Sequence, residues 1–142
     1  MPARLIRVSS RALGPRNTVR VWIYDTVEEL RAAAVRHSPD EDFSEAGGCY
    51  QHRDVWRIEA DGSEKLIESS DIVRLWRERL GSDVTTHEMN HAAVSIYGRS
   101  LPDDTLASEV LHGANEELAY LASDLTMHLV DALYANGYYD HG

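Results

Sequence analysis

Two histidines that stand four residues apart, His87 and His91, constrain this chain more than any other feature of its sequence. They enclose a glutamate in the pattern H-E-x-x-H, which here reads His87-Glu88-Met89-Asn90-His91. On an α-helix, side chains at positions i and i+4 lie one above the other on the same face. Two imidazoles held in this way can bind one zinc ion at about 2.0–2.1 Å each. Glu88 would then lie beside the ion, near a bound water. The alternative is a pair of surface histidines that hold no metal.

The residues around this motif predict the helix that it needs. We expect a helix over residues 83–97, with Gly98 directly behind it. Ala92 and Ala93 follow the second histidine, and side chains this small would let another element approach closely. A chain of this composition contains an H-E-x-x-H match by chance with a probability of about 0.03. Pattern and context together indicate a metal-binding helix.

The other elements indicate an α+β fold built on a short mixed or antiparallel sheet, with an N-terminal helix. Residues 19–25 are β-branched and aromatic in near alternation, which is typical of a strand. Thr26 and Glu29 then form a capping box for a helix that runs to about residue 34. Asp61-Gly62 predicts a hairpin turn. We expect further short strands over residues 49–53, 55–60 and 64–68.

Two more helices are expected on either side of the motif helix. Residues 70–80 carry apolar side chains at helical spacing, and Gly81 would end that helix. The last long helix is expected to begin at Asn115, a good N-cap residue, and to reach about residue 135. Asn136-Gly137 would end it.

Length and charge suggest one domain over residues 19–142, preceded by a basic arm over residues 1–18. The first 24 residues hold five arginines and no acid, whereas residues 100–142 hold eight acids and no lysine or arginine. We expect the arm to be solvated or to pack on the acidic C-terminal half. Contact with nucleic acid and a role as a transit peptide are the alternatives. A net charge of −10 argues against non-specific nucleic-acid binding by the whole chain, because a polyanion would be repelled.

Cysteine count and hydropathy exclude several classes of protein. Cys49 is the single cysteine, so an internal disulfide and an all-cysteine metal cluster are both excluded. We expect Cys49 to be a small buried residue rather than a nucleophile. No apolar run approaches the roughly 18 residues of a membrane span, and no secretory signal is evident. The expectation is a cytoplasmic protein.

A catalytic zinc site needs three protein ligands and one open position. The start of the last helix offers two acids, Glu116 and Glu117. Glu116 shares a helix face with small residues that would let this helix press against the motif helix, so it is the favoured third ligand. Glu117 is the main alternative. His112, Asp124 and His128 are the remaining candidates. Acids in the first turn of a helix are common, because they interact favourably with the helix dipole. Only the upstream motif makes these two acids candidates for metal ligands.

These residues resemble the gluzincin group of zinc metallopeptidases, which includes thermolysin and the small single-domain minigluzincins. The resemblance rests on the H-E-x-x-H motif and on residues 115–120, which read N-E-E-L-A-Y. Gluzincins take their third ligand, a glutamate, from a following helix, often within N-E or E-x-x-A, and Glu116 matches both forms. Small metallopeptidase-like proteins of phages and prophages are similar too. Thermolysin-type enzymes carry an Asp shortly after the ligand glutamate, which orients a histidine, but Asp124 lies eight residues past Glu116 and cannot be its equivalent.

The resemblance implies hydrolysis of peptide bonds in a peptide or protein substrate. Zinc held by His87, His91 and Glu116 would activate a water, and Glu88 would act as general base. His112 is a catalytic candidate for stabilising the oxyanion, with Tyr97 and Tyr120 as alternatives. The substrate would lie along the edge strand of the sheet, so that the hairpin over residues 55–68 forms the cleft wall.

A different function would use the same metal ligands. The chain could be a non-enzymatic binding or assembly module, of phage or regulatory type, that zinc stabilises. In that case His112 or His128 would fill the fourth position of a closed site. A protein that binds nucleic acid through its N-terminal arginines is the third hypothesis. We expect no membrane partner, and the oligomeric state is not predicted.

Overall fold

The computed structural model describes residues 3–102 and 115–139, which form a mixed four-stranded sheet and three helices. The strand order is β1-β2-β4-β3. Strands β1 and β2 pair antiparallel, as do β3 and β4, and the two central strands β2 and β4 run parallel. The prediction of an α+β fold is therefore confirmed. The strands are β1 (Arg4–Ser10), β2 (Asn17–Tyr24), β3 (Gly48–Ile58) and β4 (Glu64–Trp76).

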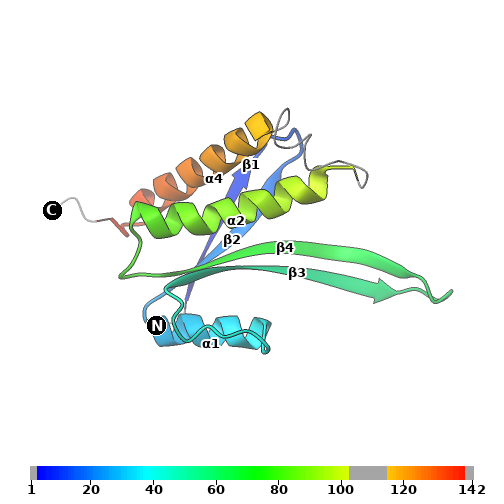
Figure 1. Ribbon diagram of the computed structural model, residues 1–142, viewed down its shortest axis with the longest axis horizontal. Coiled ribbons are helices and arrows are strands. Elements are labelled where there is room, and N and C mark those ends of the chain that lie inside the picture. The colour runs from blue at the N-terminus through cyan, green and yellow to red at the C-terminus, as the bar shows by residue number, and fades with distance from the viewer. Residues whose placement is uncertain (1–2, 103–114, 140–142) are drawn as a thin grey trace.

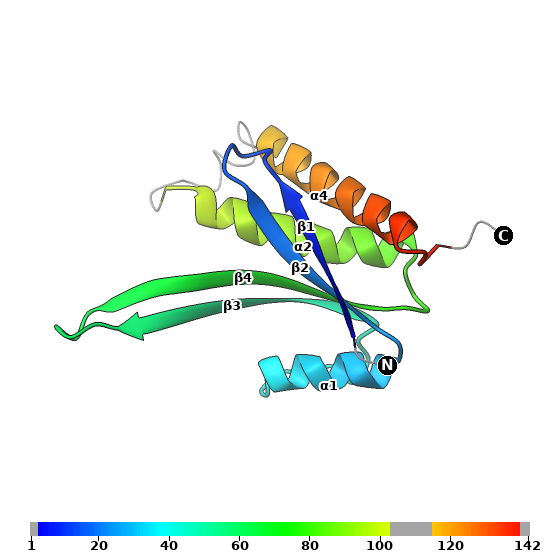
Figure 2. The same cartoon turned by 180° about the vertical axis from the view of Figure 1, so that it is seen from behind.

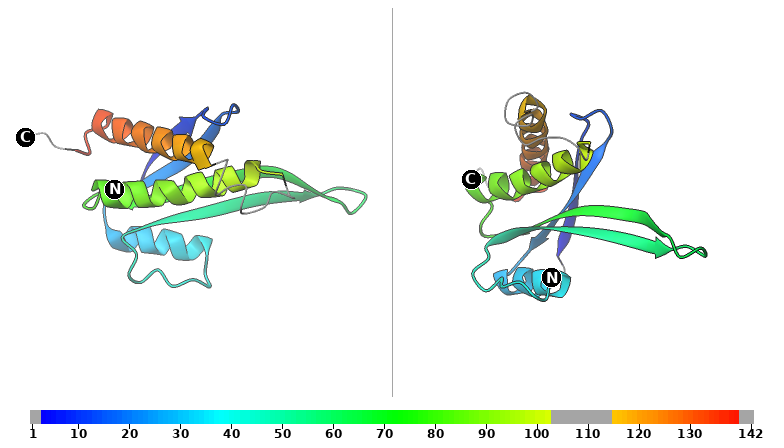
Figure 3. Two further views of the ribbon diagram at one scale, coloured as in Figure 1. Left: turned by 45° about the horizontal axis from the view of Figure 1, so that its top comes forward. Right: turned by 45° about the vertical axis from the view of Figure 1, so that its right-hand side comes forward.

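The helices lie on both faces of this sheet (Figures 1 and 2). Helix α1 (Val27–His37) covers one face at one end of the sheet. Helices α2 (Ser82–Ser100) and α4 (Asn115–Ala135) lie side by side on the opposite face, as the two views of Figure 3 also show. Helix α2 packs against β3, β4 and α4, whereas α4 packs against β1 and α2.

Local sequence signals explain where the helices begin and end. The Thr26 hydroxyl accepts a hydrogen bond from the Glu29 backbone N–H and donates one to the Glu29 carboxylate, each at 3.2 Å. Thr26 is therefore the N-cap residue, as predicted, but the Glu29 carboxylate bonds the Thr26 hydroxyl and not the backbone N–H that completes a capping box. The last helix spans residues 115–135, as predicted. Gly137 follows it with a φ of +78°, a left-handed conformation that favours glycine. The motif helix α2 is a few residues longer than expected.

Successive side chains of each strand point to opposite faces of the sheet, so the core has two parts, one on each face. On the side of α2 and α4, strand residues such as Val21 and Val73 are fully buried. They pack with leucines that recur at every fourth position of α4, each of them 0% exposed: Leu121, Leu125, Leu129 and Leu133. On the side of α1, a smaller cluster joins Tyr24 and Cys49 to Leu30 and Phe43. Cys49 is buried, as expected.

The predicted helix over residues 70–80 is wrong. Residues 70–76 instead complete β4, which pairs with β2 on one side and with β3 on the other. Six consecutive residues, 70–75, are buried because this central strand is covered on both faces. A strand buried on both faces does not alternate between polar and apolar residues. The apolar residues of this strand are also spaced as they would be on one face of a helix, which explains the wrong prediction.

Two further differences concern the edges of the sheet. Residues 4–10 of the basic N-terminal segment form strand β1, in which Ile6, Val8 and Ser10 alternate inward. The two short strands expected over residues 49–60 are one strand, β3, whose pairing with β4 shifts register between Val55 and Trp56. The predicted turn is present, and Gly62 has a φ of +87°.

The far end of the β3–β4 hairpin extends beyond the helices (Figure 1). Apolar side chains on this projecting part are exposed, among them Trp56 and Ile58. In the described part of the chain, no helix is long and apolar enough to cross a membrane.

Candidate metal centre

Helix α2 presents its H-E-x-x-H motif beside the edge strand of the sheet. Thr85, Met89, Ala92, Ala93 and Ile96 are all nearly or completely buried and anchor one face of the helix in the core. Residues 87 and 91 lie at the margin of that face and are exposed. Ala92 and Ala93 are 0% exposed, so the small residues behind the motif do permit the close packing that the sequence predicted.

The motif brings three potential metal ligands together. One ligand atom each of His87, Glu88 and His91 lies within 4.8 Å of the other two, and no other group of this kind occurs in the part of the chain that the structure describes. The Nε2 atoms of the two histidines are 3.1 Å apart. Their rings meet edge to face, at an interplanar angle of 81°. The His87 Nε2 atom lies 3.8 Å from Glu88 Oε1.

This geometry fits a small tetrahedral cation such as zinc. With metal–nitrogen bonds of about 2.05 Å, a nitrogen separation of 3.1 Å corresponds to an N–metal–N angle of about 98°, near the tetrahedral value of about 109°. Without an ion, one ring can instead donate a hydrogen bond to the other. The chemistry of the donor set, two imidazoles and a carboxylate, matches the ligands that zinc prefers.

The carboxylate of Glu88 is held in an unfavourable environment. The residue is 6% exposed, and its Oε2 atom has no hydrogen-bond partner among the described residues. Burial raises the pKa of Glu88 above its ordinary value, although protonated His87 and His91 would lower it. A buried carboxylate with a free oxygen and a raised pKa is suited to accept a proton or to meet a cation.

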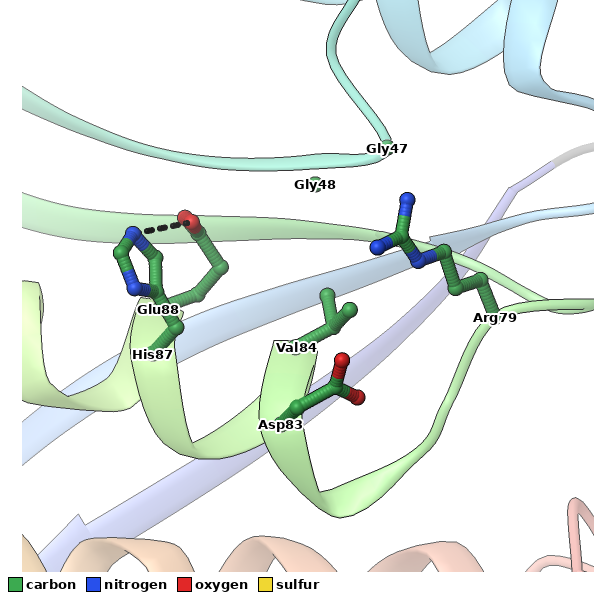
Figure 4. Close-up of a pocket in the computed structure, with 7 residues that line it drawn as sticks. All are labelled: Gly47, Gly48, Arg79, Asp83, Val84, His87 and Glu88. Atoms are coloured by element: carbon green, nitrogen blue, oxygen red, sulfur yellow. Dashed lines mark ion pairs between the residues drawn. The ribbon is translucent and has the colours of Figure 1, made fainter.

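Two glycines allow the edge strand to approach this carboxylate. A Cβ atom on Gly48 would lie 3.0 Å from Val84 Cγ1 and 3.5 Å from Glu88 Cγ, so a side chain at this position would press on the motif helix. A Cβ atom on Gly47 would lie 3.0 Å from the Arg79 guanidinium. These glycines border a cavity of about 360 Å³ next to His87 and Glu88 (Figure 4).

The cavity carries charges of both signs besides the motif. Arg79 and Asp83 line it together with Val84 (Figure 4). The cavity thus joins the motif to the beginning of β3. It lies at the opposite end of β3 from the hairpin turn, so the hairpin over residues 55–68, which we expected to wall the cleft, is not part of its lining.

A buried polar network supports the other side of the motif. The Tyr50 ring lies nearly parallel to the His91 ring, with centroids 6.4 Å apart. The Tyr50 hydroxyl donates to the buried Asp71 carboxylate, which also pairs with the Arg99 guanidinium at 2.6 Å. Burial, followed by the hydrogen bond to Asp71, raises the pKa of Tyr50 to about 12. Asp71 and Arg99 therefore fix the Tyr50 ring on the side of the motif where His91 lies.

Sequence reasoning missed this network. The only signal available was an acid, Asp71, at the start of a segment that is apolar except for Arg74 and that ends at Trp76. The role of Asp71 can be recognised only from the strand register, which places Tyr50 opposite Val73 and His52 opposite Asp71.

Comparisons with known proteins give no further guide to this site. No protein-family model, curated protein or solved structure matches the chain.

The predicted site residues fall into two groups. His87, Glu88 and His91 come together as expected. Glu116 and Glu117 occupy the first turn of α4, where both are exposed, and neither belongs to the metal-binding group. Burial raises the pKa of Tyr97, and the charge of Glu117 adds to this effect, so the start of α4 lies near Tyr97. That tyrosine is about 9 Å further along α2 than His91.

The remaining candidates lie elsewhere or outside the described residues. Asp124 accepts a hydrogen bond from Ser10, and the His128 Nδ1 atom lies 2.7 Å from the Ser9 carbonyl, so both side chains contact β1. Tyr120 is 65% exposed on α4. His112 lies outside the described residues.

Proposed function

We infer that this chain is a zinc-dependent hydrolase that cleaves peptide bonds. The observation that carries this inference is the convergence of two imidazole nitrogens, 3.1 Å apart, beside a buried carboxylate that has a free oxygen. When bound, zinc would supply Lewis acidity, which makes a water molecule more acidic and a carbonyl group more electrophilic.

Each side chain of the motif would have a separate role in the reaction. His87 and His91 would hold the ion, and Tyr50 would keep the His91 ring in place through its parallel contact. The Glu88 carboxylate would accept the proton of the attacking water at its free Oε2 atom and then pass it to the leaving amine. Its raised pKa favours this exchange, because a general base works best when its pKa approaches the working pH.

Strand β3 offers a place for an extended substrate. It is an edge strand, so one side of its backbone has no partner strand in the described sheet. A peptide that paired with this edge near Gly48 would pass the cavity beside His87 and Glu88. The two charged residues of the cavity, Arg79 and Asp83, would then contact the side chains of the peptide.

The third protein ligand is a separate question with two candidates. Glu88 is within reach of both histidines and could bind the ion itself. Glu116 is the ligand that the resemblance to gluzincins implies, and it would have to come from the first turn of α4. The two candidates are distinguished by metal content. Glu88→Gln retains the metal if Glu88 is the base, and Glu116→Gln loses it if Glu116 is the ligand, with Glu117→Gln as the neighbouring control.

The decisive experiment combines metal analysis with activity on a peptide library. We expect about one zinc per chain in wild-type protein, and loss of zinc in His91→Ala but not in the control His128→Ala. We expect Glu88→Gln to retain zinc and to lose hydrolysis by a factor of at least about 100. Zinc binding without hydrolysis of any peptide would instead indicate a metal-stabilised binding module. Unchanged hydrolysis in Glu88→Gln would contradict the mechanism.

A further inference from the structure

The face of the sheet opposite the candidate metal centre carries a concentrated positive charge. A cavity of about 510 Å³ between α1 and the sheet is lined by four arginines and by no aspartate or glutamate: Arg20, Arg36, Arg53 and Arg74. The whole chain has only 14 basic residues against 24 acidic ones. A cavity lined by four arginines and by no acid is therefore contrary to the charge of the molecule as a whole.

The strand register explains how these arginines meet. Trp22 is the partner of Arg74 across β2 and β4, and Arg20 is the partner of Ile72 on the same pair of strands. Arg53 lies on β3, opposite Ser70 of β4. Alternate positions on the three strands point to the same face, so all of these side chains lie on the side of α1. Arg36 reaches the cavity from the last turn of α1.

Arg74 is a buried cation with only neutral partners. It is 8% exposed, and its Nε atom donates to Gln51 Oε1 at 2.7 Å while its Nη1 atom donates to the Tyr24 hydroxyl at 2.7 Å. It forms no ion pair with any described residue, and its Nη2 atom has no hydrogen-bond partner among them. Burial of a charge is costly unless an opposite charge compensates it. The Nη2 atom of Arg74 is therefore available to an anionic ligand.

The neighbouring arginines leave further donors free. Arg20 pairs with Glu68 at 3.2 Å. For Arg36 and Arg53, the structure shows neither an ion pair nor a hydrogen bond to a described residue. Guanidinium groups bind phosphate oxygens through paired hydrogen bonds, and a phosphate can accept from several of them at once. Trp22 lines the same cavity and offers an aromatic surface for a flat ring.

We propose that this cavity binds a phosphorylated small molecule of mononucleotide size. The phosphate lies against Arg74, Arg53 and Arg36, and the ring of the ligand lies against Trp22. The cavity volume is within the range of about 300–1,000 Å³ that is usual for small-molecule sites. The site does not depend on the proposed hydrolase function, because α2 and its motif lie on the other face of the sheet (Figure 2).

The test is calorimetric titration of the full chain with adenosine monophosphate, adenosine and citrate. We expect adenosine monophosphate to bind with a Kd below about 1 mM, and adenosine and citrate to bind at least about tenfold more weakly. Arg53→Gln and Arg36→Gln should each weaken binding by about tenfold or more. Arg57→Gln is the matched control, because Arg57 lies on the same strand but pairs with Glu59 at 2.9 Å and does not line the cavity. It should bind like the wild type.

Further measurements distinguish binding at this cavity from binding elsewhere or of another kind. The variant His87→Ala with His91→Ala should bind adenosine monophosphate unchanged, whereas loss of binding there would place the anion at the metal centre and overturn the proposal. Citrate binding that equals or exceeds that of the nucleotide would overturn the assignment to phosphate. Binding of a single-stranded oligonucleotide without any binding of the mononucleotide would overturn the small-molecule site. Equal affinity in Arg53→Gln, Arg36→Gln and wild type would do the same.

Discussion

Glu88 is costly for the metal-free protein to bury, and this cost can be measured. The residue is 6% exposed, its Oε2 atom has no partner among the described residues, and its Oε1 atom is 3.8 Å from His87 Nε2, which is beyond a hydrogen bond. A buried polar group without a partner costs about 1–3 kcal/mol. Glutamine keeps the shape and removes the charge. We expect Glu88→Gln to raise the free energy of unfolding by about 1 kcal/mol at neutral pH, or about 3 °C in Tm.

The pH dependence of this effect has a definite sign. Burial raises the pKa of Glu88 in the folded protein above its ordinary value. A carboxyl group with a raised pKa binds more protons in the folded state than in the unfolded state, so the folded protein loses stability as pH rises through this window. The advantage of Glu88→Gln is therefore largest above the folded-state pKa of Glu88. It disappears below about pH 4.3, the pKa of an unperturbed glutamate.

The assay is urea unfolding in excess chelator, repeated at several values between about pH 4 and pH 8. Glu117→Gln serves as the control, because it removes an exposed carboxylate and should change the free energy of unfolding by less than about 0.5 kcal/mol. Zinc should stabilise wild type and Glu88→Gln alike if Glu88 is the base. The reasoning is refuted if metal-free Glu88→Gln is less stable than wild type at neutral pH, or if the difference does not vary with pH.

Three further predictions concern the fold around the site. Leu125→Ala, at a residue of α4 that is 0% exposed in the larger core cluster, should lower the free energy of unfolding by about 3 kcal/mol in urea titration. Asp71→Asn should cost about 2–3 kcal/mol by the same measurement, because Tyr50 and Arg99 lose their shared charged partner, and a loss below 1 kcal/mol would contradict this role. Burial raises the pKa of Cys49 to about 11, so native protein at about pH 8 should react with iodoacetamide far more slowly than protein unfolded in urea, as followed by mass spectrometry.

Features of the site that depend on one helix could be predicted from the sequence. The spacing of His87, Glu88 and His91 places them together because helical geometry is local, and this prediction is confirmed. The bounds of α4 were predicted for the same reason, since Asn115 and Gly137 mark its ends. The role of Glu116 depends on how α4 lies against α2, and that is a matter of tertiary packing. It stays a prediction.

Features that depend on strand register could not be predicted in this way. Residues 70–76 were assigned to a helix because β4 is buried on both faces and so lacks alternation. With β4 misassigned, nothing in the sequence could bring Asp71 to Tyr50 on one face or Arg74 to Trp22 on the other. Strand β1 carried a readable signal in the alternation of Ile6 and Val8, but its arginines favoured an arm instead.

The parallel pairing of the two central strands determines how the chain can assemble. Strands β1 and β2 are close neighbours in sequence, as are β3 and β4, so each pair can form early as a local hairpin. The seam between β2 and β4 joins Val19 to Asp71, about fifty positions later, and closing it costs much more chain entropy. The motif helix follows both hairpins in the chain and packs against β3 and β4, which form the second hairpin, and against α4. The seam must therefore close before α2, which rests on one hairpin, can pack against α4, which rests on the other.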